Sequence, residues 1–594
     1  MALRASPFSS GCVSGLHAAG WALVFPCFWF LDRLMAGCKS TTRERAARRD
    51  QECYLHPLRV LFGSLLFLTL FLLWAPLALL GFLLWAPLQA ARRPFRYHHQ
   101  GAPSPPTLPV DERNADWLRT GRLSFGFATA NLCLLPDSLA RFNNLGDTQR
   151  RAAAIGGSIV QGVTRPHIRI FVDSPSSCGT LSPSSSLLAS SSAPAPSYGA
   201  METQAPPSAD DTPSEEEEAA QENATPTHSS SSVTVVPPCD DPVANSNQNS
   251  SQQPDGVVVV GGAGGKRRNP PRALGALGRS GADVPVEVSA MFPPGVDLLC
   301  LEEVFDQRAG ARLRDSLAPL FGHVLYDVGV YACHPPCCCS SFKFFNSGLF
   351  VASRLPLLEA QYHCFPNARG EDALAAKGLL CVKVLINLQD QGNQRMVGYF
   401  NCTHLHAPEG DGDVRVEQLN LVSRWIDEFQ EVHAEEGEIV MFDVLCGDFN
   451  FDNCSPDDVR EQNHSLFDQY CDPCRAAAGR EKPWVIGTLL EQPTLYDEEV
   501  RTPDSLQRTL EQEALRKQYL SPPVARGGAP VSCPEGGGPW TGRRLDYVLY
   551  RESTTAKNTR TEVEEFTYVT QLAGLTDHIP VGLRLTVTLP PKES

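Results

Sequence analysis

Two long apolar runs open the chain, and shorter strand-like patterns follow them. No charged residue lies between Ser6 and Leu31, and none lies between Val60 and Ala91. The second run has roughly 32 residues, so as one straight helix it would be roughly 48 Å long, whereas a bilayer core is about 30 Å thick. We expect a membrane-associated region over residues 1–100, with hydrophobic segments at about 11–35 and 60–91.

Arginines flank the second apolar run on both sides. Arg33, Arg45 and Arg48 precede it, and Arg92 and Arg93 follow it. Basic residues prefer the cytoplasmic side of a membrane, so both ends of this run are expected there. A re-entrant hairpin that turns near Pro76 meets this requirement and a single span does not; both topologies stay open. The same arginines are candidates for binding anionic headgroups, at about 1 kcal/mol per residue near a charged leaflet.

Composition divides the rest of the chain. Residues 101–121 are rich in proline and polar side chains and form a linker or collar. Residues 174–283 consist largely of serine, proline, glycine, alanine and acidic residues, which cannot bury a core, so we expect a disordered insertion. The flanking pieces, 122–173 and 284–587, should form one folded domain interrupted by this insertion.

Within that domain, short apolar strands alternate with helical patterns. Residues 298–301, 397–400 and 545–550 are typical of buried strands, and residues 416–431 and 503–516 are typical of helices. Many strands with helices between them favour an α/β fold in which one sheet packs on another and helices cover the outside.

Charge and cysteine content exclude two classes of protein. The net charge of −16 argues against a dedicated nucleic-acid binder, which needs a basic face. The 20 cysteines do not form a secreted disulfide framework. Several stand singly in apolar runs, such as Cys300, Cys381 and Cys446, where a free cysteine behaves as a small hydrophobe in a reducing compartment.

Polar residues stand at the ends of predicted strands: Asn131, Glu303, His404, Asp448 with Asn450, and the pair Asp577 and His578. The apolar run from Ile439 leads to Gly447, where we expect the strand to end in a tight glycine turn that presents Asp448 and Asn450. Polar groups gathered at one edge of a sheet are typical of a binding cleft.

The residue types indicate a chemistry. A carboxylate with an amide suits Mg²⁺, which takes few protein ligands and keeps several waters. A histidine beside an aspartate suits a general base whose ring the carboxylate orients. A second histidine can stabilise charge on phosphoryl oxygens. Together they indicate metal-assisted attack of water on phosphorus.

The order of these motifs resembles the endonuclease/exonuclease/phosphatase superfamily, the fold of deoxyribonuclease I. The segments 127–141, 402–408, 446–454 and 576–578 resemble the membrane-anchored neutral sphingomyelinases in particular, as do Phe25-Pro26-Cys27 and residues 31–34. The resemblance implies a deoxyribonuclease I-like four-layer β-sandwich flanked by helices, preceded by a helical membrane-hairpin region.

The resemblance also implies residue roles. Glu303 is expected to be the main Mg²⁺ ligand, supported by Asn131, with Mn²⁺ as an alternative ion. His578 is expected to be the general base beside Asp577, and His404 and Asn346 to contact the phosphoryl oxygens. Asp448 and Asn450 would position the nucleophile and the phosphate; whether Asp448 touches metal, water or phosphate stays open. Two further expectations are a regulatory switch, Asp372 and Lys377, and palmitoylated positions among Cys53, Cys337, Cys338 and Cys339.

The implied activity is hydrolysis of sphingomyelin to ceramide and phosphocholine, with anionic phospholipids as activators and no nucleic-acid partner. The implied location is a membrane with a cytoplasmic catalytic domain, at the Golgi and the inner leaflet of the plasma membrane, or alternatively in mitochondria. An inositol-polyphosphate phosphatase on the same fold is the competing function.

Overall fold

The computed structural model describes residues 3–50, 56–100, 121–165, 284–333, 342–389, 394–525, 540–555 and 559–589. The chain divides into two compact units, Met1–Ile170 with Gly281–Ser594, and Phe171–Ser280. The second unit lies outside the described residues, as do the predicted disordered insertion and nearly all of the predicted linker.

The N-terminal region is helical. It consists of α1 (Gly11–Cys38), the short basic α2 (Thr42–Asp50), α3 (His56–Leu88) and the 3-10 turn η1 (Gln89–Ala91). Both α1 and α3 are long and apolar enough to cross a membrane. These two helices contain the two predicted hydrophobic segments.

The two apolar helices pair with each other. Gly20 lies against Gly81, where an added Cβ on Gly81 would come within 2.7 Å of the Gly20 carbonyl oxygen, and the Trp74 indole donates to the Leu23 carbonyl at 2.9 Å. Small residues allow such close approach of apolar helices. Because residues later in α1 meet residues earlier in α3, the pair is an antiparallel hairpin.

This hairpin differs from the one predicted. We expected the second apolar run to turn back on itself near Pro76, but α3 continues through Pro76 as one helix. A hairpin made by that run alone is therefore wrong. The proline removes one backbone hydrogen bond, yet the helix continues on both sides of it and packs against α1.

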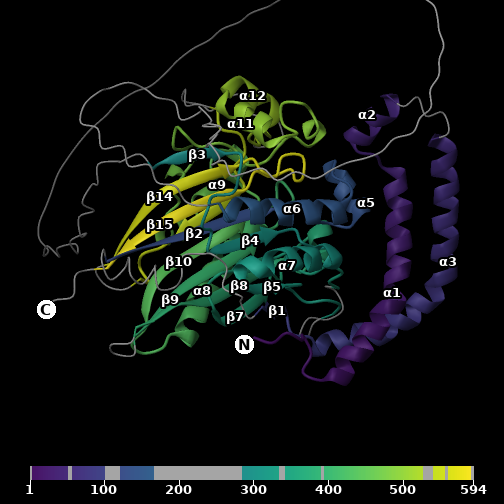
Figure 1. Cartoon of the computed structure of the whole chain (residues 1–594), viewed down its shortest axis with the longest axis horizontal. Coiled ribbons are helices and arrows are strands. Elements are labelled where there is room, and N and C mark those ends of the chain that lie inside the picture. Colours follow the sequence, from purple (N-terminus) through teal and green to yellow (C-terminus); the bar gives the residue numbers. More distant parts are fainter. Residues whose placement is uncertain are drawn as a thin grey trace, which may run out of the picture. The chain divides into compact units, whose positions relative to one another are not determined.

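Two sheets form the body of the folded domain (Figure 1). Within the described residues, the larger sheet has eight strands in the order β1-β5-β6-β4-β2-β15-β14-β3. Their bounds are β1 Arg96–His99, β2 Arg122–Asn131, β3 Val286–Ser289, β4 Leu298–Glu302, β5 His323–Tyr326, β6 Phe350–Ser353, β14 Arg560–Val569 and β15 Val581–Thr588.

The smaller sheet has five described strands in the order β13-β10-β9-β8-β7. Their bounds are β7 Leu357–Cys364, β8 Gly378–Gln389, β9 Gln394–His404, β10 Ile439–Asp448 and β13 Asp546–Tyr550. The strands β9 and β10 run parallel, and β13 runs antiparallel to β10. The end of β10 therefore meets the start of β13. A two-stranded ribbon, β11 (Arg475–Ala477) and β12 (Arg480–Glu481), stands apart.

Helices cover the outer faces of both sheets. One apolar cluster joins the larger sheet to α6 and α7, and another joins the smaller sheet to α8. The remaining short helices lie in connections. The bounds are α5 Asp137–Ala140, η2 Arg141–Asn143, α6 Thr148–Val163, α7 Gln307–Phe321, η3 Gly370–Leu374, α8 Gly412–His433, η4 Pro456–Asp458, α9 Val459–Gln462, α10 Leu466–Gln469, η5 Gln492–Thr494, α11 Pro503–Glu511 and α12 Glu513–Tyr519.

The main core lies between the two sheets. Alternate residues of β2 share it: Phe125 and Phe127 face the smaller sheet, while Ala128 and Ala130 face the outer helices. This period of two is the alternation that strand geometry imposes. The layers are thus helix, sheet, sheet and helix, which confirms the predicted four-layer sandwich.

Candidate active site

The candidate site lies where inner-face rows of side chains reach the ends of their strands. Three pairs of residues, each two positions apart on one strand, lead to the site: Thr129 and Asn131 on β2, Cys402 and His404 on β9, and Cys446 and Asp448 on β10. Side chains two apart point to the same face of a sheet. Asp546 joins them because it opens β13 directly opposite Asp448.

Asp448 is the centre of this group. Its Oδ2 accepts a hydrogen bond of 2.8 Å from Asn131 Nδ2 across the two sheets. The same oxygen lies 3.6 Å from His404 Nε2 and 3.9 Å from His578 Nε2. Three residues that lie far apart in the sequence therefore converge on the Asp448 carboxylate.

The partner that orients His578 is Asp546. His578 Nδ1 and Asp546 Oδ2 are 2.8 Å apart. The prediction that the neighbouring Asp577 orients this ring is wrong, because successive residues of an extended segment point to opposite sides. Asp577 Oδ2 instead accepts from Gln492 Nε2 at 3.3 Å. Sequence reasoning missed Asp546; the only available signal was a carboxylate inside the predicted buried strand at 545–550.

Two residues at the site hold left-handed backbone conformations. Glu303 has φ +58° and Asn450 has φ +54°, a region that non-glycine residues adopt rarely and at some cost. The predicted glycine turn is wrong: Gly447 lies inside β10, which continues to Asp448. Glycine is nevertheless required there, because a Cβ at 447 would collide with the Thr403 carbonyl oxygen. The turn follows at Asn450, whose backbone N–H donates to Asp448 Oδ1 at 2.9 Å.

Burial and neighbouring carboxylates shift the pKa values of several side chains at the site. Burial raises the pKa of Glu303 to about 7, and the charge of Asp577 adds to that rise. Burial also raises the pKa of Asp448. Burial alone would lower the pKa of His578, but Asp546 and then Asp448 raise it well above its ordinary value.

The donor set fits a divalent cation. Glu303 Oε2, Asp577 Oδ1 and Asp546 Oδ1 are buried oxygens without a hydrogen-bond partner. Buried carboxylate oxygens are costly unless something compensates their charge, and oxygen ligands are what Mg²⁺ prefers. Among the residues predicted to hold the metal, Glu303 has the free oxygen, while Asn131 is bonded to Asp448.

Glu302, the neighbour of Glu303, serves the core instead. Its Oε1 accepts from Thr129 Oγ1 at 2.5 Å and from Cys300 Sγ at 2.9 Å. Burial raises the pKa of Glu302 well above its ordinary value, so the neutral acid is favoured. Of these two adjacent glutamates, Glu303 therefore belongs to the candidate site, and Glu302 belongs to the buried layer of side chains beneath it.

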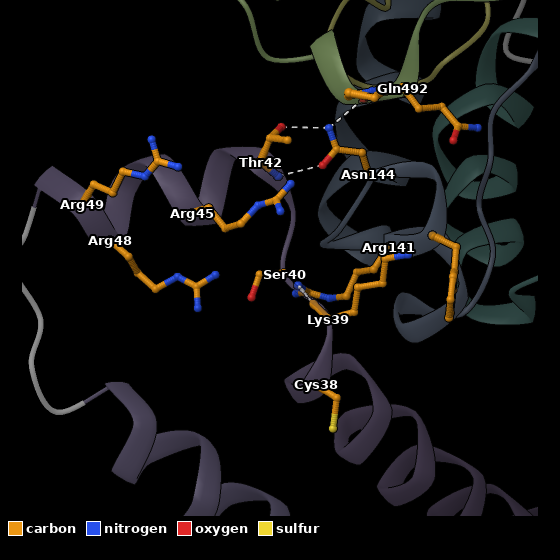
Figure 2. Close-up of a pocket in the computed structure, with 12 residues that line it drawn as sticks. Cys38, Lys39, Ser40, Thr42, Arg45, Arg48, Arg49, Arg141, Asn144 and Gln492 are labelled. Atoms are coloured by element: carbon orange, nitrogen blue, oxygen red, sulfur yellow. Dashed lines mark hydrogen bonds between the residues drawn. The ribbon is translucent and has the colours of Figure 1, made fainter. Parts of the chain in front are cut away.

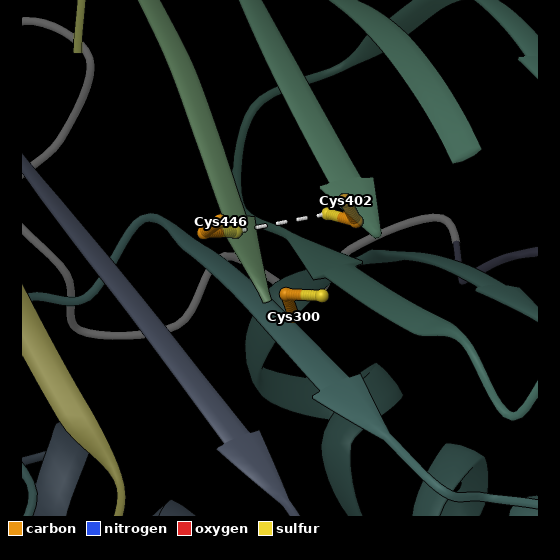
Figure 3. A group of neighbouring side chains, drawn as sticks. All are labelled: Cys300, Cys402 and Cys446. Atoms are coloured by element: carbon orange, nitrogen blue, oxygen red, sulfur yellow. Dashed lines mark hydrogen bonds between the residues drawn. The ribbon is translucent and has the colours of Figure 1, made fainter. Parts of the chain in front are cut away.

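Three cysteines complete that layer. The sulfurs of Cys300, Cys402 and Cys446 lie within 4.8 Å of one another, and those of Cys402 and Cys446 are 3.9 Å apart (Figure 3). Cys300 and Cys446 each stand singly in an apolar run of the sequence, and β4, β9 and β10 bring them together with Cys402 across the two sheets. Burial raises the pKa of Cys300 well above its ordinary value, which fits thiols packed as small hydrophobes under the site.

Asn346, Asp372 and Lys377 border the site. Asn346 Oδ1 accepts from the Gly348 N–H at 2.9 Å, and its Nδ2 lies 3.4 Å from the Val304 carbonyl oxygen. Lys377 and Asp372 form a buried ion pair of 2.9 Å. Lys377 also donates to the carbonyl of Leu405, the residue after His404, at 3.2 Å. Burial lowers the pKa of His404, and the charge of Lys377 lowers it further.

A basic pocket lies between α2 and the folded domain (Figure 2). Its cavity of about 640 Å³ is lined by five cationic side chains, Lys39, Arg45, Arg48, Arg49 and Arg141. Asn144 joins the two sides, because its Oδ1 accepts from the Thr42 N–H at 2.7 Å and its Nδ2 donates to the Gln492 carbonyl at 2.7 Å. Since Gln492 also donates to Asp577, hydrogen bonds connect this pocket with the candidate active site.

The other predicted lipid-binding arginines have different surroundings. Arg92 is buried and forms an ion pair of 2.7 Å with Asp327, and its guanidinium also donates to the carbonyls of Gly329 and Asp327 at 2.7 and 2.8 Å. A headgroup contact by Arg92 is therefore contradicted. Arg33 lies 3.5 Å from Asp137, and the backbone of Arg93 donates to Pro7; neither lines the basic pocket.

Comparison with known proteins decides the family. Residues 12–91 match the neutral sphingomyelinase N-terminal transmembrane region, and residues 261–578 match the Endonuclease/Exonuclease/phosphatase family. Sphingomyelin phosphodiesterase 5 of Danio rerio is 62% identical over 590 residues, covering 99% of each chain. The chain belongs to the neutral sphingomyelinase family. Sphingomyelin phosphodiesterase 3 of Rattus norvegicus, in the same family, is 41% identical over 664 residues, covering 100% of both chains.

Among solved structures, sphingomyelinase C from Streptomyces griseocarneus is similar at 16% identity and a TM-score of 0.30, covering 49% of this chain and 86% of that chain. The family assignment agrees with the deoxyribonuclease I-like sandwich and with the apolar helices at the N-terminus.

The predicted palmitoylation sites, Cys53, Cys337, Cys338 and Cys339, lie outside the described residues.

Proposed function

We propose that the protein is a Mg²⁺-dependent sphingomyelin phosphodiesterase of phospholipase C type. Water attacks the phosphorus of sphingomyelin, the phosphorus–oxygen bond to ceramide breaks, and ceramide and phosphocholine are released. The observation that carries the proposal is the convergence of Glu303, Asp448 and His578 in a chain that belongs to the neutral sphingomyelinase family.

His578 is the proposed base. Because Asp546 holds its Nδ1, the opposite nitrogen, Nε2, is the atom available to accept a proton from water. Asp448 lies 3.9 Å from that nitrogen and is fixed by Asn131. These residues hold and orient the attacking water. The departing ceramide oxygen must also be protonated. His578 supplies the proton that it has taken from water.

Glu303 is the proposed metal ligand, with Asn131 as a supporting residue. A bound Mg²⁺ would polarise the phosphoryl oxygens and offset the repulsion among the carboxylates. His404 and Asn346 are the proposed contacts to the phosphoryl oxygens, and Asn450 is proposed to position the phosphate. The buried pair Asp372 and Lys377 supports a regulatory role, because a shift of Lys377 would alter the charge beside His404.

Membrane attachment supports a lipid substrate. In α1, Trp21 packs against an apolar cluster formed by Trp85, Tyr331 and Ala332. Further along the same helix, Asp32 Oδ1 accepts a hydrogen bond of 2.8 Å from the Ser138 N–H of the folded domain. This stretch of helix, about 16 Å long, has protein on one face, which favours a hairpin that lies at the membrane surface with both ends on one side. We place that side in the cytoplasm, at the Golgi and the inner leaflet of the plasma membrane, with mitochondria as the alternative.

Anionic phospholipids are the proposed activators, bound in the basic pocket of Arg45 and Arg48. Arg45→Ala with Arg48→Ala should lower hydrolysis on vesicles that contain an anionic lipid and leave hydrolysis on neutral vesicles unchanged. The matched control is Arg43→Ala, which removes one charge from the same helix outside the pocket. An equal loss on neutral vesicles would refute the headgroup role.

The decisive experiment is direct hydrolysis. The full-length protein with Mg²⁺ should release phosphocholine from sphingomyelin vesicles, measured against phosphoinositide vesicles and inositol polyphosphates. Faster release of phosphate from the inositol substrates would favour the competing function, an inositol-polyphosphate phosphatase.

A further inference from the structure

Three buried thiols beneath the candidate active site have no part in the proposed reaction. Cys402 and Cys446 lie directly opposite each other on the parallel strands β9 and β10, and Cys300 faces them from β4 of the larger sheet (Figure 3). All three side chains are fully buried in the main core. Because they come from three strands of two sheets, the fold itself fixes their distances from one another.

The spacing of the sulfurs suits a single metal ion. A metal–sulfur bond of about 2.3 Å would put the sulfurs of a three-coordinate ion about 4 Å apart. The sulfurs of Cys402 and Cys446 are 3.9 Å apart, and all three sulfurs lie within 4.8 Å of one another. A contraction of less than about 1 Å would therefore bring all three into contact with one ion.

A carboxyl group beside the thiols points to a cation independently. Glu302 Oε1 accepts a hydrogen bond from Cys300 Sγ at 2.9 Å, whereas Glu302 Oε2 is buried and has no hydrogen-bond partner. A buried polar oxygen without a partner is costly. A positive charge among the neighbouring sulfurs would offset that cost.

The donor set selects the ion. Thiolate sulfur is a soft ligand that favours Cu⁺ and Zn²⁺ over the hard ion Mg²⁺. Structural Zn²⁺ sites are almost always four-coordinate, but the group that the described residues offer has three ligand atoms, all of them sulfur. Burial by itself would raise the pKa of Cys446, but hydrogen bonds with Cys300 and Cys402 lower it. This three-sulfur group therefore favours Cu⁺.

We propose that Cys300, Cys402 and Cys446 bind one Cu⁺ ion beneath the active site. Three copper–sulfur bonds form, the thiol protons leave to water, and copper and sulfur keep their oxidation states. In the metal-free protein the same thiols pack as small hydrophobes, so the core is complete with or without the ion. This site is separate from the proposed Mg²⁺ site at Glu303.

A bound ion would act on the catalytic residues through the strands. His404 follows Cys402 by two residues, and Asp448 follows Cys446 by two residues. Drawing the sulfurs together shifts the strand ends that carry these side chains, and a misplacement of about 1 Å can cost about 10²-fold in rate. We expect Cu⁺ to lower kcat on sphingomyelin by about 10–100-fold. This effect rests on the proposed function, whereas the binding site does not.

Retention of copper in competition with a Cu⁺ chelator tests the site. The full-length wild type, loaded with Cu⁺ under anaerobic conditions, should retain one ion per chain. Cys402→Ala and Cys446→Ala should each lose it. The matched control is Cys381→Ala, because Cys381 is buried on the neighbouring strand β8 but belongs to the apolar cluster that joins the smaller sheet to α8. Equal retention by Cys402→Ala and the wild type would overturn the site.

A second measurement leaves the cluster unchanged, so it does not depend on how the alanine variants fold. The triple variant Cys337→Ser with Cys338→Ser and Cys339→Ser removes the run of consecutive cysteines in the sequence and should retain the ion. X-ray absorption on this copper-loaded variant should show three sulfur neighbours. Loss of the ion, or fewer than three sulfurs, would overturn the site. Displacement of bound Cu⁺ by an equal amount of Zn²⁺ would overturn the choice of ion.

Hydrolysis of sphingomyelin tests the effect on catalysis. Copper loading should lower kcat of the wild type but not that of Cys402→Ala, and excess Mg²⁺ should not restore the wild type because soft thiolates do not select Mg²⁺. An unchanged kcat, or equal inhibition of both proteins, would overturn this effect. If the copper-free wild type with Mg²⁺ cleaves no sphingomyelin, the proposed function fails instead, while copper retention still measures the thiol site.

Discussion

The carboxylate of Asp546 lies 2.8 Å from Nδ1 of His578. An ionised carboxylate only accepts hydrogen bonds, so Nδ1 carries the hydrogen, and in the neutral ring Nε2 is left free. This tautomer directs the unprotonated nitrogen toward Asp448, whose Oδ2 lies 3.9 Å away. The pair therefore joins the start of β13 to the C-terminal His578 segment.

Asp546→Asn should lower kcat on sphingomyelin by about 10²–10⁴-fold. An amide can donate its own hydrogen to Nδ1 and so stabilise the wrong tautomer, while its size remains that of aspartate. Turnover under saturating substrate measures the effect, and a melting curve shows whether the fold is retained. Asp315→Asn, which changes an exposed aspartate on α7, is the control and should leave kcat unchanged. Wild-type kcat in Asp546→Asn would contradict the assignment of the orienting residue.

The sandwich could be predicted from the sequence because its strands are strongly patterned. The predicted strands at 298–301, 397–400 and 545–550 correspond to β4, β9 and β13, and the helix at 416–431 corresponds to α8. Each contributes alternating or amphipathic apolar positions that local pattern alone reveals. The residues at the strand ends could be found for the same reason, since a polar side chain directly after a buried strand is conspicuous.

Pairings across the fold could not be predicted in this way. Asp546 looks like one more residue of a strand until β13 is placed antiparallel to β10. The grouping of Cys300 with Cys402 depends on how the two sheets stack. The ion pair of Arg92 depends on the position of Asp327, far along the chain. Each of these contacts depends on tertiary geometry, which periodicity does not encode.

Glu303 and Glu302 give a matched test of the metal site. Mg²⁺ should raise the melting temperature of the wild type, because a ligand that binds only the folded state stabilises it. Glu303→Gln should abolish that shift, since it removes the carboxylate whose Oε2 has no partner. Glu302→Gln should keep the shift, because Glu302 is bonded within the core. Thermal melts with and without Mg²⁺, in the presence of a chelator as reference, measure the effect.

Loss of the Mg²⁺ shift in both variants would point to general damage rather than to a ligand. Retention of the shift in Glu303→Gln would contradict its assignment as the metal ligand. Activity on sphingomyelin provides the second measurement: chelation should abolish it in the wild type and in Glu302→Gln, and added Mg²⁺ should restore it.

Asn144 offers a test of communication between the basic pocket and the active site. Asn144→Ala removes the hydrogen bonds to Thr42 and Gln492 but keeps the five cationic side chains of the pocket. We expect binding to anionic vesicles to persist, because the charges remain, while stimulation of hydrolysis by those vesicles falls, because Gln492 no longer holds a fixed position beside Asp577. Vesicle co-sedimentation and phosphocholine release measure the two effects separately.

Asn143→Ala is the control for that variant. Asn143 precedes Asn144 in the same turn but its side chain contacts Cys133, outside the pocket. It should retain both binding and stimulation. If Asn144→Ala keeps full stimulation, the pocket acts only by attaching the protein to the membrane. If Asn144→Ala loses binding as well, Asn144 belongs to the headgroup site and not to a connection.

Arg92 separates a structural role from a lipid-binding role. Its guanidinium forms an ion pair with Asp327, and both side chains are almost fully buried, at 3% and 7% exposure. Removing one partner of a buried pair costs about 3–5 kcal/mol when the other charge is left uncompensated, but Asp327 keeps Arg96 at 3.2 Å as a second cationic partner. Arg92→Ala should therefore lower the free energy of unfolding by less than that amount, measured by denaturant titration, and should reduce hydrolysis equally on neutral and anionic vesicles. The double variant Arg92→Ala with Asp327→Ala should regain part of the stability, because both charges of the buried pair are then removed. The control Arg45→Ala should leave the stability unchanged. A loss confined to anionic vesicles, with wild-type stability, would instead return Arg92 to the headgroup site.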